Sequence, residues 1–288
     1  MNISRISQQR GNYETNNYRN SRNTQVNREP FTSVKETVAQ HEPTMNKRGF
    51  MHPLSKTSKQ FVQYASSITL PVVDLGCAYG IATIEAAKAG ASKVIACDME
   101  QKHLDMLESR AAKLGLTSQI TTRLGQFPND LFFENNTVGA VLASLVLAYL
   151  TIEELATGLK NIFKWLIPGG KLFIVSYSIH IKEFANPRFQ TEYQRRVDSL
   201  EKWPGYFEDF NKYSTMAEEN ANENSIPIRL HFFDILPLVK ALEDVGFEVE
   251  VSQYLDGRSN GAVQDTWYDG REMLGVIARK LNYSKSKL

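Results

Sequence analysis

The feature that most constrains the fold is a regular alternation of short apolar runs and amphipathic segments between residues 71 and 177. The intervening segments have helical spacing, and two of them end at a glycine. Strand–helix repeats of this length need right-handed crossovers, which give a mostly parallel sheet with helices on both faces. The pattern therefore predicts a doubly wound α/β fold. The expected strands are residues 71–75, 93–97, 120–123, 138–145 and 171–177.

The rest of the chain divides into a tail, an insertion and a completion of the sheet. Residues 1–44 are expected to be a disordered polar tail, because the first thirty residues carry seven Asn and five Arg without an apolar period. Residues 45–288 form the predicted domain. Residues 178–230 are too long for a simple connection, and their many aromatic side chains suggest a helical cap over the strand ends. A helix over 233–245 and strands over 247–251 and 271–279 are expected to complete the sheet.

Residues 74–80, with the sequence Asp-Leu-Gly-Cys-Ala-Tyr-Gly, follow the first expected strand and precede a helix. Gly76 and Gly80 permit a tight turn and close backbone approach by a ligand. Asp98 ends the second strand and is placed to accept hydrogen bonds from both hydroxyls of a ribose. Ligands of open α/β sheets bind beyond the carboxyl ends of the strands, so this combination predicts a nucleoside-containing cofactor.

The amino-acid sequence of the glycine turn discriminates between classes of cofactor. Dinucleotide sites use Gly-x-Gly-x-x-Gly, which brings a helix N-terminus to a pyrophosphate. Here Ala78 occupies the middle position, and Asp74 places a carboxylate just before the turn. A carboxylate suits a cationic cofactor better than a diphosphate, so a dinucleotide-dependent oxidoreductase is disfavoured.

At these residues the chain resembles the class I S-adenosylmethionine-dependent methyltransferases, a seven-stranded Rossmann-like family. The resemblance covers about residues 59–280 and rests on the turn 74–80, Asp98, the strand 138–145 and the Leu-Ile-Pro-Gly-Gly-Lys-Leu segment 166–172. It implies a mostly parallel seven-stranded sheet with an antiparallel last strand. It also implies S-adenosyl-L-methionine as the cofactor.

The resemblance assigns roles to individual positions. In the family, Gly76 and Gly80 correspond to residues against the methionine portion, Asp74 faces its amino group and Asp98 holds the ribose. Gln126 follows the third strand and corresponds to a side chain near adenine, where many members have an acid instead. The candidate cofactor-binding residues are Asp74, Gly76, Cys77, Ala78, Gly80, Asp98, Met99, Gln126, Phe127 and Ser144.

Two histidines are candidates for a general base. Methyl transfer from a sulfonium needs in-line approach in a desolvated pocket, and a protonated amine or a hydroxyl acceptor needs a base as well. His180 lies just past the fifth strand, and His231 lies where the cap returns to the domain. Either is the expected catalytic residue, although each is also readily explained as a structural histidine. Tyr149 and Tyr177 end the fourth and fifth strand regions. The hydroxyl of each is placed to orient an acceptor, or the ring serves only in packing.

Charge and hydropathy exclude several functional classes. The formal net charge is +1, and the cap carries seven basic and nine acidic residues, so no nucleic-acid partner is expected. Residues 143–149 lack the Asn/Asp-Pro-Pro-aromatic segment of enzymes that methylate nucleic-acid bases. The longest apolar run, 138–150, is too short to cross a bilayer and no secretory signal is evident, so a cytoplasmic protein without a membrane partner is expected. Cys77 and Cys97 lie in apolar segments without a nearby His or Cys, so neither a disulfide nor a metal site is expected.

The leading hypothesis is a methyltransferase that acts on an oxygen or nitrogen of a small molecule. An aromatic cap of mixed charge suits an apolar acceptor with a polar handle. One alternative keeps the cofactor and makes a protein side chain the acceptor. Another is a non-catalytic binding module that retains the fold. The sequence specifies neither the acceptor nor the oligomeric state.

Overall fold

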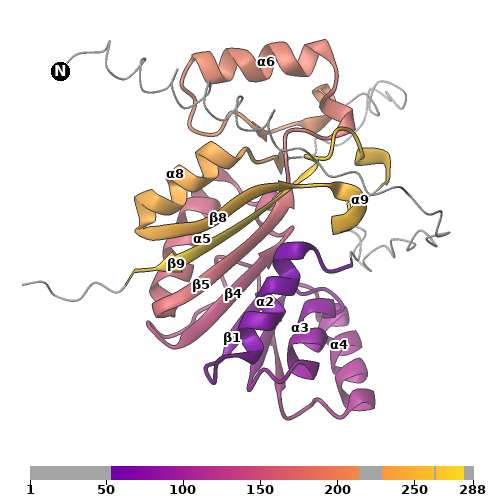
Figure 1. Cartoon of the computed structure of the whole chain (residues 1–288), viewed down its shortest axis with the longest axis vertical. Coiled ribbons are helices and arrows are strands. Elements are labelled where there is room, and N and C mark those ends of the chain that lie inside the picture. The colour runs from indigo at the N-terminus through magenta and orange to yellow at the C-terminus, as the bar shows by residue number, and fades with distance from the viewer. Residues whose placement is uncertain (1–52, 214–228, 263, 282–288) are drawn as a thin grey trace, which may run out of the picture. The chain divides into compact units, whose positions relative to one another are not determined.

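Within residues 53–213, 229–262 and 264–281, which the computed structural model describes, seven strands form one sheet in the order β3-β2-β1-β4-β5-β9-β8 (Figure 1). Strands β1 to β5 are parallel, and β9 is antiparallel to both of its neighbours. The predicted doubly wound sheet with an antiparallel last strand is therefore confirmed. The predicted tail, 1–44, lies outside the described residues. The strands are β1 (Val72–Leu75), β2 (Val94–Asp98), β3 (Ile120–Leu124), β4 (Val138–Ser144), β5 (Leu166–Tyr177), β8 (Phe247–Leu255) and β9 (Met273–Lys280).

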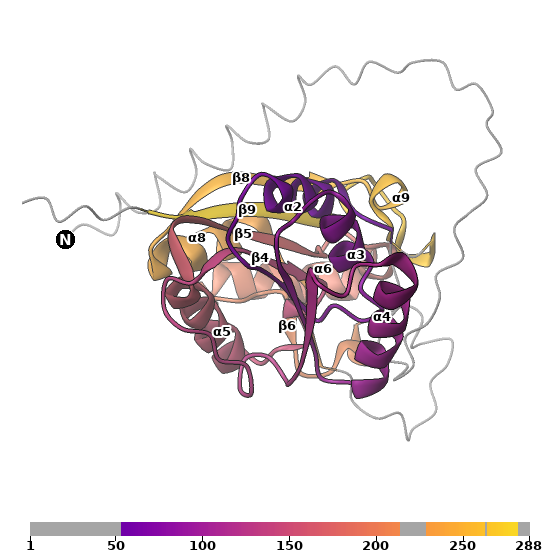
Figure 2. The same cartoon turned by 90° about the horizontal axis from the view of Figure 1, so that it is seen from below.

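Helices cover both faces of the sheet, as the end-on view in Figure 2 shows. One face carries α2 (Lys56–Ser66), α3 (Ile81–Lys88) and α4 (Gln101–Leu114), whose apolar residues share a buried cluster with β1 and β2. The other face carries α5 (Ile152–Trp165) and α8 (Ile235–Val245) over a second cluster. The central strands β1 and β2 are buried along their whole length, which explains why they read as continuous apolar runs.

Local sequence signals account for several element boundaries. The Thr151 side chain accepts a hydrogen bond from the Glu154 amide while the Glu154 carboxylate caps the Thr151 amide, so α5 begins with the predicted capping box. Gly115 follows the last residue of α4 and has φ +70°, a left-handed conformation that favours glycine. In this conformation its amide donates to the carbonyl oxygens of Ala111 and Ala112 at the end of the helix.

Two strands extend beyond the predicted limits because pairing continues past the sequence signal. Strand β5 begins at Leu166, which pairs with Val138 before a register shift brings Lys171 opposite Ala140. Strand β8 continues to Leu255 because β9 supplies partners along its length, although its sequence after 251 loses the apolar alternation. Tertiary pairing, rather than local pattern, sets both ends.

The cap contains more than helices. Its described part holds α6 (Pro187–Asp198), short 3₁₀ turns at Lys182–Phe184 (η2) and Phe210–Lys212 (η3), and β6 (Tyr206–Phe207), which pairs with β7 (Leu230–His231). Figure 1 shows α6 above the sheet, on the side of α8 and β8. The Tyr193 hydroxyl donates to Asp234 (2.9 Å), the N-cap of α8, and so links α6 to the domain.

Candidate functional site

The glycine turn between β1 and α3 has a backbone that requires small residues. Gly76 has φ +64°, Ala78 has φ +44° and Gly80 has φ +74°. A Cβ at Gly76 would lie 3.0 Å from a methyl of Val146, and a Cβ at Gly80 would overlap Leu107 of α4. Both glycines are therefore needed for the conformation as well as for packing. The turn leaves the amide of Ala78 directed at the end of β2.

Asp98 links the end of β2 to the glycine turn. Its carboxylate accepts hydrogen bonds from the backbone amides of Ala78 and Glu100, each at 2.9 Å. His103 Nδ1 lies 3.1 Å from the same carboxylate, and both side chains are buried. Asp98 is thus held in a fixed orientation at the position where the sequence predicted a ribose ligand. The role of His103 as its partner was not predicted, because its place five residues into the next segment gave only a helix-face signal.

Asp74 is a buried carboxylate next to the same turn. It is 3% exposed and accepts a hydrogen bond from the Thr83 hydroxyl (2.7 Å). Burial raises the pKa of Asp74 to about 7, and the nearby Asp98 charge adds to the rise, whereas the hydrogen bonds from Thr83 lower it. A positive group brought against this carboxylate would stabilise its ionised form.

A cavity of about 710 Å³ runs from the glycine turn to the underside of the cap. All of the predicted cofactor-binding residues except Gly80 line it; Gly80 lies behind the turn against Leu107. We call this region, residues 74, 76–78, 98–99, 125–127 and 144 together with His103, the cofactor half. The opposite region, formed by Ile181, Glu183, Phe210, Arg229, Leu230 and Phe232, is the cap half.

The segment after β3 contributes both to the cavity and to the core. The backbone amide of Gln126 donates a hydrogen bond to Asp130 Oδ2 (3.0 Å), which fixes the turn after β3. The ring of Phe127 is 5% exposed and packs edge-on against Trp165, with 6.1 Å between ring centroids. Phe127 therefore borders the cavity mainly as part of the α5 side of the core.

Neither of the two predicted base histidines is among the described residues that line the cavity. His180 packs edge-on against Tyr254 of β8 at 5.0 Å, and burial lowers its pKa. His231 is 1% exposed, stacks on Phe233 at 4.0 Å, and burial lowers its pKa to about 3. His180 thus packs against β8 and His231 against Phe233, which lies just before α8, and their role as bases stays a prediction that the cavity lining does not support.

The cavity wall contains groups that sequence reasoning missed. Glu183 is 6% exposed and lines the cap half. Asp265, which lies between α9 (Gly257–Asn260) and β9, borders the same space. Tyr149 and Tyr177 line it as well; Tyr177 ends β5 as expected, whereas Tyr149 lies in a 3₁₀ turn, Leu147–Tyr149, after β4. The local sequence does not single out Glu183, because Lys182 and Glu183 both stand between apolar Ile181 and Phe184.

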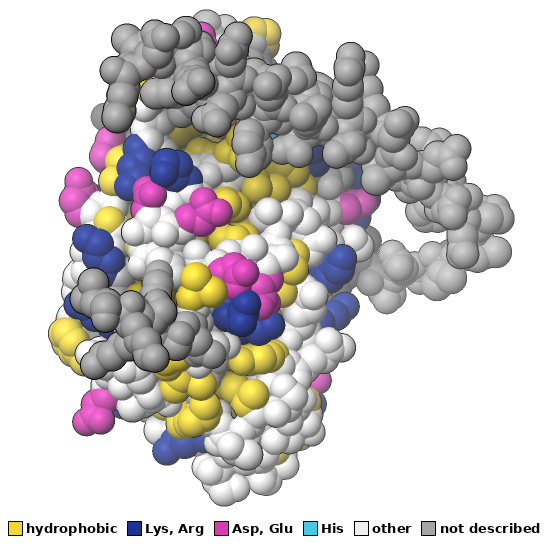
Figure 3. Space-filling model, turned by 60° about the vertical axis from the view of Figure 1, so that its left-hand side comes forward, with side chains coloured by type: hydrophobic (Ala, Val, Ile, Leu, Met, Phe, Trp, Pro, Cys, Tyr) yellow, Lys and Arg dark blue, Asp and Glu magenta, His cyan; other side chains and the backbone are white. Residues whose placement is uncertain are grey.

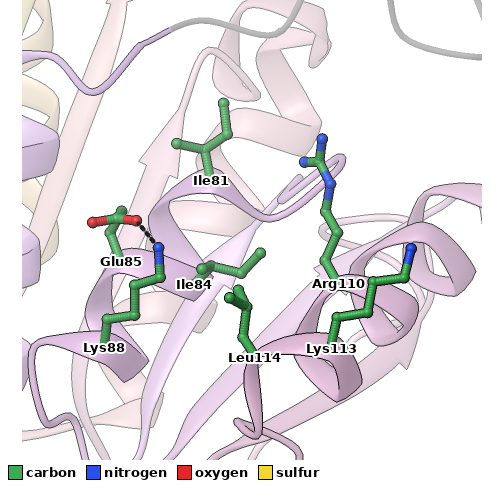
Figure 4. Close-up of a pocket in the computed structure, with 7 residues that line it drawn as sticks. All are labelled: Ile81, Ile84, Glu85, Lys88, Arg110, Lys113 and Leu114. Atoms are coloured by element: carbon green, nitrogen blue, oxygen red, sulfur yellow. Dashed lines mark hydrogen bonds and ion pairs between the residues drawn. The ribbon is translucent and has the colours of Figure 1, made fainter.

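A second hollow, of about 380 Å³, lies on the outer surface between α3 and α4 (Figure 4). It shares only Ile81 with the lining of the larger cavity among the described residues. Figure 4 shows its charged groups along the two helices, with Glu85 paired to Lys88 at 2.9 Å. Its salt-bridged, solvated lining gives no chemistry to assign.

Comparison with known proteins agrees with this geometry. Residues 72–170 match a family model described as a methyltransferase domain. A ribosomal protein L11 methyltransferase from Syntrophomonas wolfei is 30% identical over 127 residues, which is 44% of this chain and 41% of that protein. The chain thus spans about two fifths of the length of the curated relative it matches.

Solved structures share the fold. A SAM-dependent methyltransferase from Methanosarcina mazei superposes with a TM-score of 0.53 at 20% identity, covering 73% of this chain and 92% of that one. The [4+2]-cyclase SpnF superposes with a TM-score of 0.51 at 15% identity, covering 77% and 81%. The second likeness illustrates that the fold alone does not fix the reaction. Residues 72–170 thus match a methyltransferase domain, and the seven-stranded sheet that contains them has the Rossmann-like fold of S-adenosylmethionine-dependent methyltransferases.

Proposed function

We propose that the protein transfers a methyl group from S-adenosyl-L-methionine to an oxygen or nitrogen of a small molecule bound beneath the cap. The observation that carries this proposal is one continuous cavity that joins the glycine turn to the aromatic wall of the cap. A volume of about 710 Å³ lies within the range of small-molecule sites.

The residues of the cofactor half fit the proposed ligand. Gly76 lines the cavity, where a Cβ would crowd Val146, and Gly80 lets the turn pack closely on Leu107. Asp74 offers a buried carboxylate to a cationic amino group, and Asp98 offers a fixed carboxylate to a ribose. When bound, the cofactor supplies a methyl group on a positively charged sulfur. The protein's own contribution is to orient both reactants and to exclude water from the cavity.

A protein side chain is the second candidate acceptor. The matched relative is named for a ribosomal protein substrate, which favours this reading. The match covers less than half of either protein, so the relative's substrate is weak support for a protein acceptor here. The small-molecule acceptor is supported by the cavity, and the protein acceptor only by the relative's name. Both functions use the same cofactor half, and they differ only in whether a small molecule or a protein side chain enters the cavity beneath the cap.

The proposal does not extend to nucleic acids or membranes. On the face shown in Figure 3, basic and acidic side chains are interspersed, and the described residues there form no continuous basic patch. No described helix has the length and apolar character needed to span a bilayer.

Methyl-labelled cofactor tests the proposal directly. The full chain is incubated with labelled S-adenosylmethionine and a cell extract, and the products are separated by filtration into small molecules and macromolecules. The filtrate is then resolved by chromatography: label in a compound that forms only with the active chain and is neither the cofactor nor its breakdown product supports a small-molecule acceptor, whereas label retained with protein supports the second candidate. Thermal shift with S-adenosylhomocysteine and NAD provides the binding control, since a ligand at 100 times its dissociation constant stabilises by about 2.7 kcal/mol. Stabilisation by NAD alone would refute the proposal.

A further inference from the structure

The cap half contains a buried carboxylate that its surroundings do not satisfy. Glu183 is 6% exposed, and its Oε2 has no hydrogen-bond partner among the described residues. An unpaired buried carboxylate is costly, and removing a compensating partner from such a group costs several kcal/mol. A ligand that brings a hydrogen-bond donor or a positive charge to Glu183 would therefore gain affinity.

The surroundings of Glu183 specify the kind of ligand. Burial raises its pKa, the charge of Asp265 adds to the rise, and its own backbone amide and Lys182 lower it. Ile181, Phe210 and Phe232 supply apolar and aromatic lining beside it. Arg229 and Asp265 also border the cavity, but both are exposed, whereas Glu183 is buried. The buried part of the cap half therefore favours a cationic head on an apolar body and disfavours an anion.

We propose that Glu183 receives the reacting nitrogen of the acceptor, so that the substrate class is a primary or secondary amine with an apolar body. This inference rests on the proposed methyl transfer and narrows its acceptor to nitrogen. The amine enters as an ammonium ion and gives a proton to the Glu183 carboxylate. The freed nitrogen lone pair forms a bond to the methyl carbon while the carbon–sulfur bond breaks with its electron pair on sulfur. The product is the N-methylammonium ion.

A carboxylate suits nitrogen better than oxygen. An alkyl hydroxyl is about as weak an acid as water, whose pKa is about 15.7, so a carboxyl group of raised pKa is a poor base for it. An ammonium ion is a far stronger acid, and its charge is attracted to Glu183 before the proton moves. The same group thus binds the acceptor and removes its proton, and it lines the cavity, whereas His180 and His231 are not among the described residues that do.

The test uses two cofactor analogues and needs no acceptor. In sinefungin a carbon that bears a primary amine replaces the sulfonium centre, whereas S-adenosylhomocysteine has only the neutral sulfur there. Calorimetry measures both affinities for the wild-type chain and for Glu183→Gln. We expect the wild type to prefer sinefungin by about tenfold or more, and Glu183→Gln to lose most of that preference with unchanged S-adenosylhomocysteine affinity.

Controls separate the possible failures. Glu208→Gln removes an exposed carboxylate of the cap that lies outside the cavity and bonds to the Tyr206 hydroxyl, and it should retain the wild-type preference. If Glu183→Gln does not fold, Glu183→Asp keeps the charge but withdraws it by one methylene, and it should lower the preference. An unchanged preference in a folded Glu183 variant would overturn this inference alone. Failure of the wild type to bind either analogue would overturn the proposed function as well.

Discussion

The two halves of the cavity are built differently. In the cofactor half, carboxylates and backbone amides pair with one another, as Asp98 does with the amides of Ala78 and Glu100. In the cap half, the cavity lining combines the aromatic rings of Phe210 and Phe232 with Glu183, whose carboxylate Oε2 has no partner among the described residues. Each half holds one buried polar atom without a hydrogen-bond partner among the described residues, His103 Nε2 in the first and Glu183 Oε2 in the second, but the carboxylates of the first half are already hydrogen-bonded. This difference suggests that cofactor recognition and acceptor recognition are separable by mutation.

The strongest test of that separation is Phe184→Ala. Phe184 is fully buried in the cap and stacks on Phe189 with ring centroids 3.7 Å apart. Its loss should cost about 3–5 kcal/mol of unfolding free energy, as for other buried Phe-to-Ala changes. Urea denaturation measures that cost, and calorimetry with S-adenosylhomocysteine should show unchanged affinity. Phe132→Ala, at a position 73% exposed, is the matched control and should be nearly neutral. A parallel loss of cofactor affinity in Phe184→Ala would show that the halves are coupled.

Gly80→Ala tests the cofactor half by sterics. The new Cβ would overlap Leu107 and would sit at φ +74°, so we expect a loss of about 2–4 kcal/mol from strain and overpacking together. Gly90→Ala is the comparison, because Gly90 has φ +102° with nothing within 4 Å of the added carbon. It should show only the backbone penalty of about 1–2 kcal/mol. Equal losses in the two variants would contradict the packing role assigned to Gly80.

Asp98→Asn tests binding rather than folding. The amide offers one acceptor oxygen where the carboxylate offers two, and its NH₂ group would face the amides of Ala78 or Glu100. Affinity for S-adenosylhomocysteine should fall by about 1.5–3 kcal/mol, the usual range for hydrogen bonds to a charged group. Asp105→Asn, on the exposed side of α4 where the carboxylate bonds only to Gln101, should leave calorimetric affinity unchanged. A folded Asp98→Asn protein with wild-type affinity would remove Asp98 from the site.

The smallest expected effect is the pH dependence that Asp74 gives to the cofactor half. Its pKa of about 7 lies above the ordinary 3.8, so the free protein loses stability as the pH rises from about 4 to about 7. Binding a cationic amino group needs the ionised form. Affinity for S-adenosylmethionine should therefore fall by about tenfold from pH 8 to pH 6. Asp74→Asn should bind more weakly with a flat profile. If the slope persists in this variant, Asp74 does not carry it.

Sequence reasoning succeeded where local rules decide the structure. The glycine turn, the acids at the ends of β1 and β2 and the capping box of α5 each depend on a few consecutive residues, and they stand where they were predicted. It did not reveal that His180 packs against Tyr254 and His231 against Phe233, outside the cavity lining, because these contacts form only in the folded chain, and their role as bases stays a prediction. Glu183 was missed for the same reason, because only the folded cap shows that its carboxyl group is buried beside a cavity.

The position of β9 has a consequence for synthesis of the protein. This strand is the last in the described sequence, yet it lies between β5 and β8 and pairs with both. On a ribosome, β8 emerges before any described strand that can pair with it, so the sheet cannot close until residues 273–280 have left the exit tunnel. A premature stop just before Met273 would remove an interior strand and leave β8 unpaired with the sheet. Quality control should therefore recognise such a truncated chain as unfolded, however complete its cofactor-binding turn.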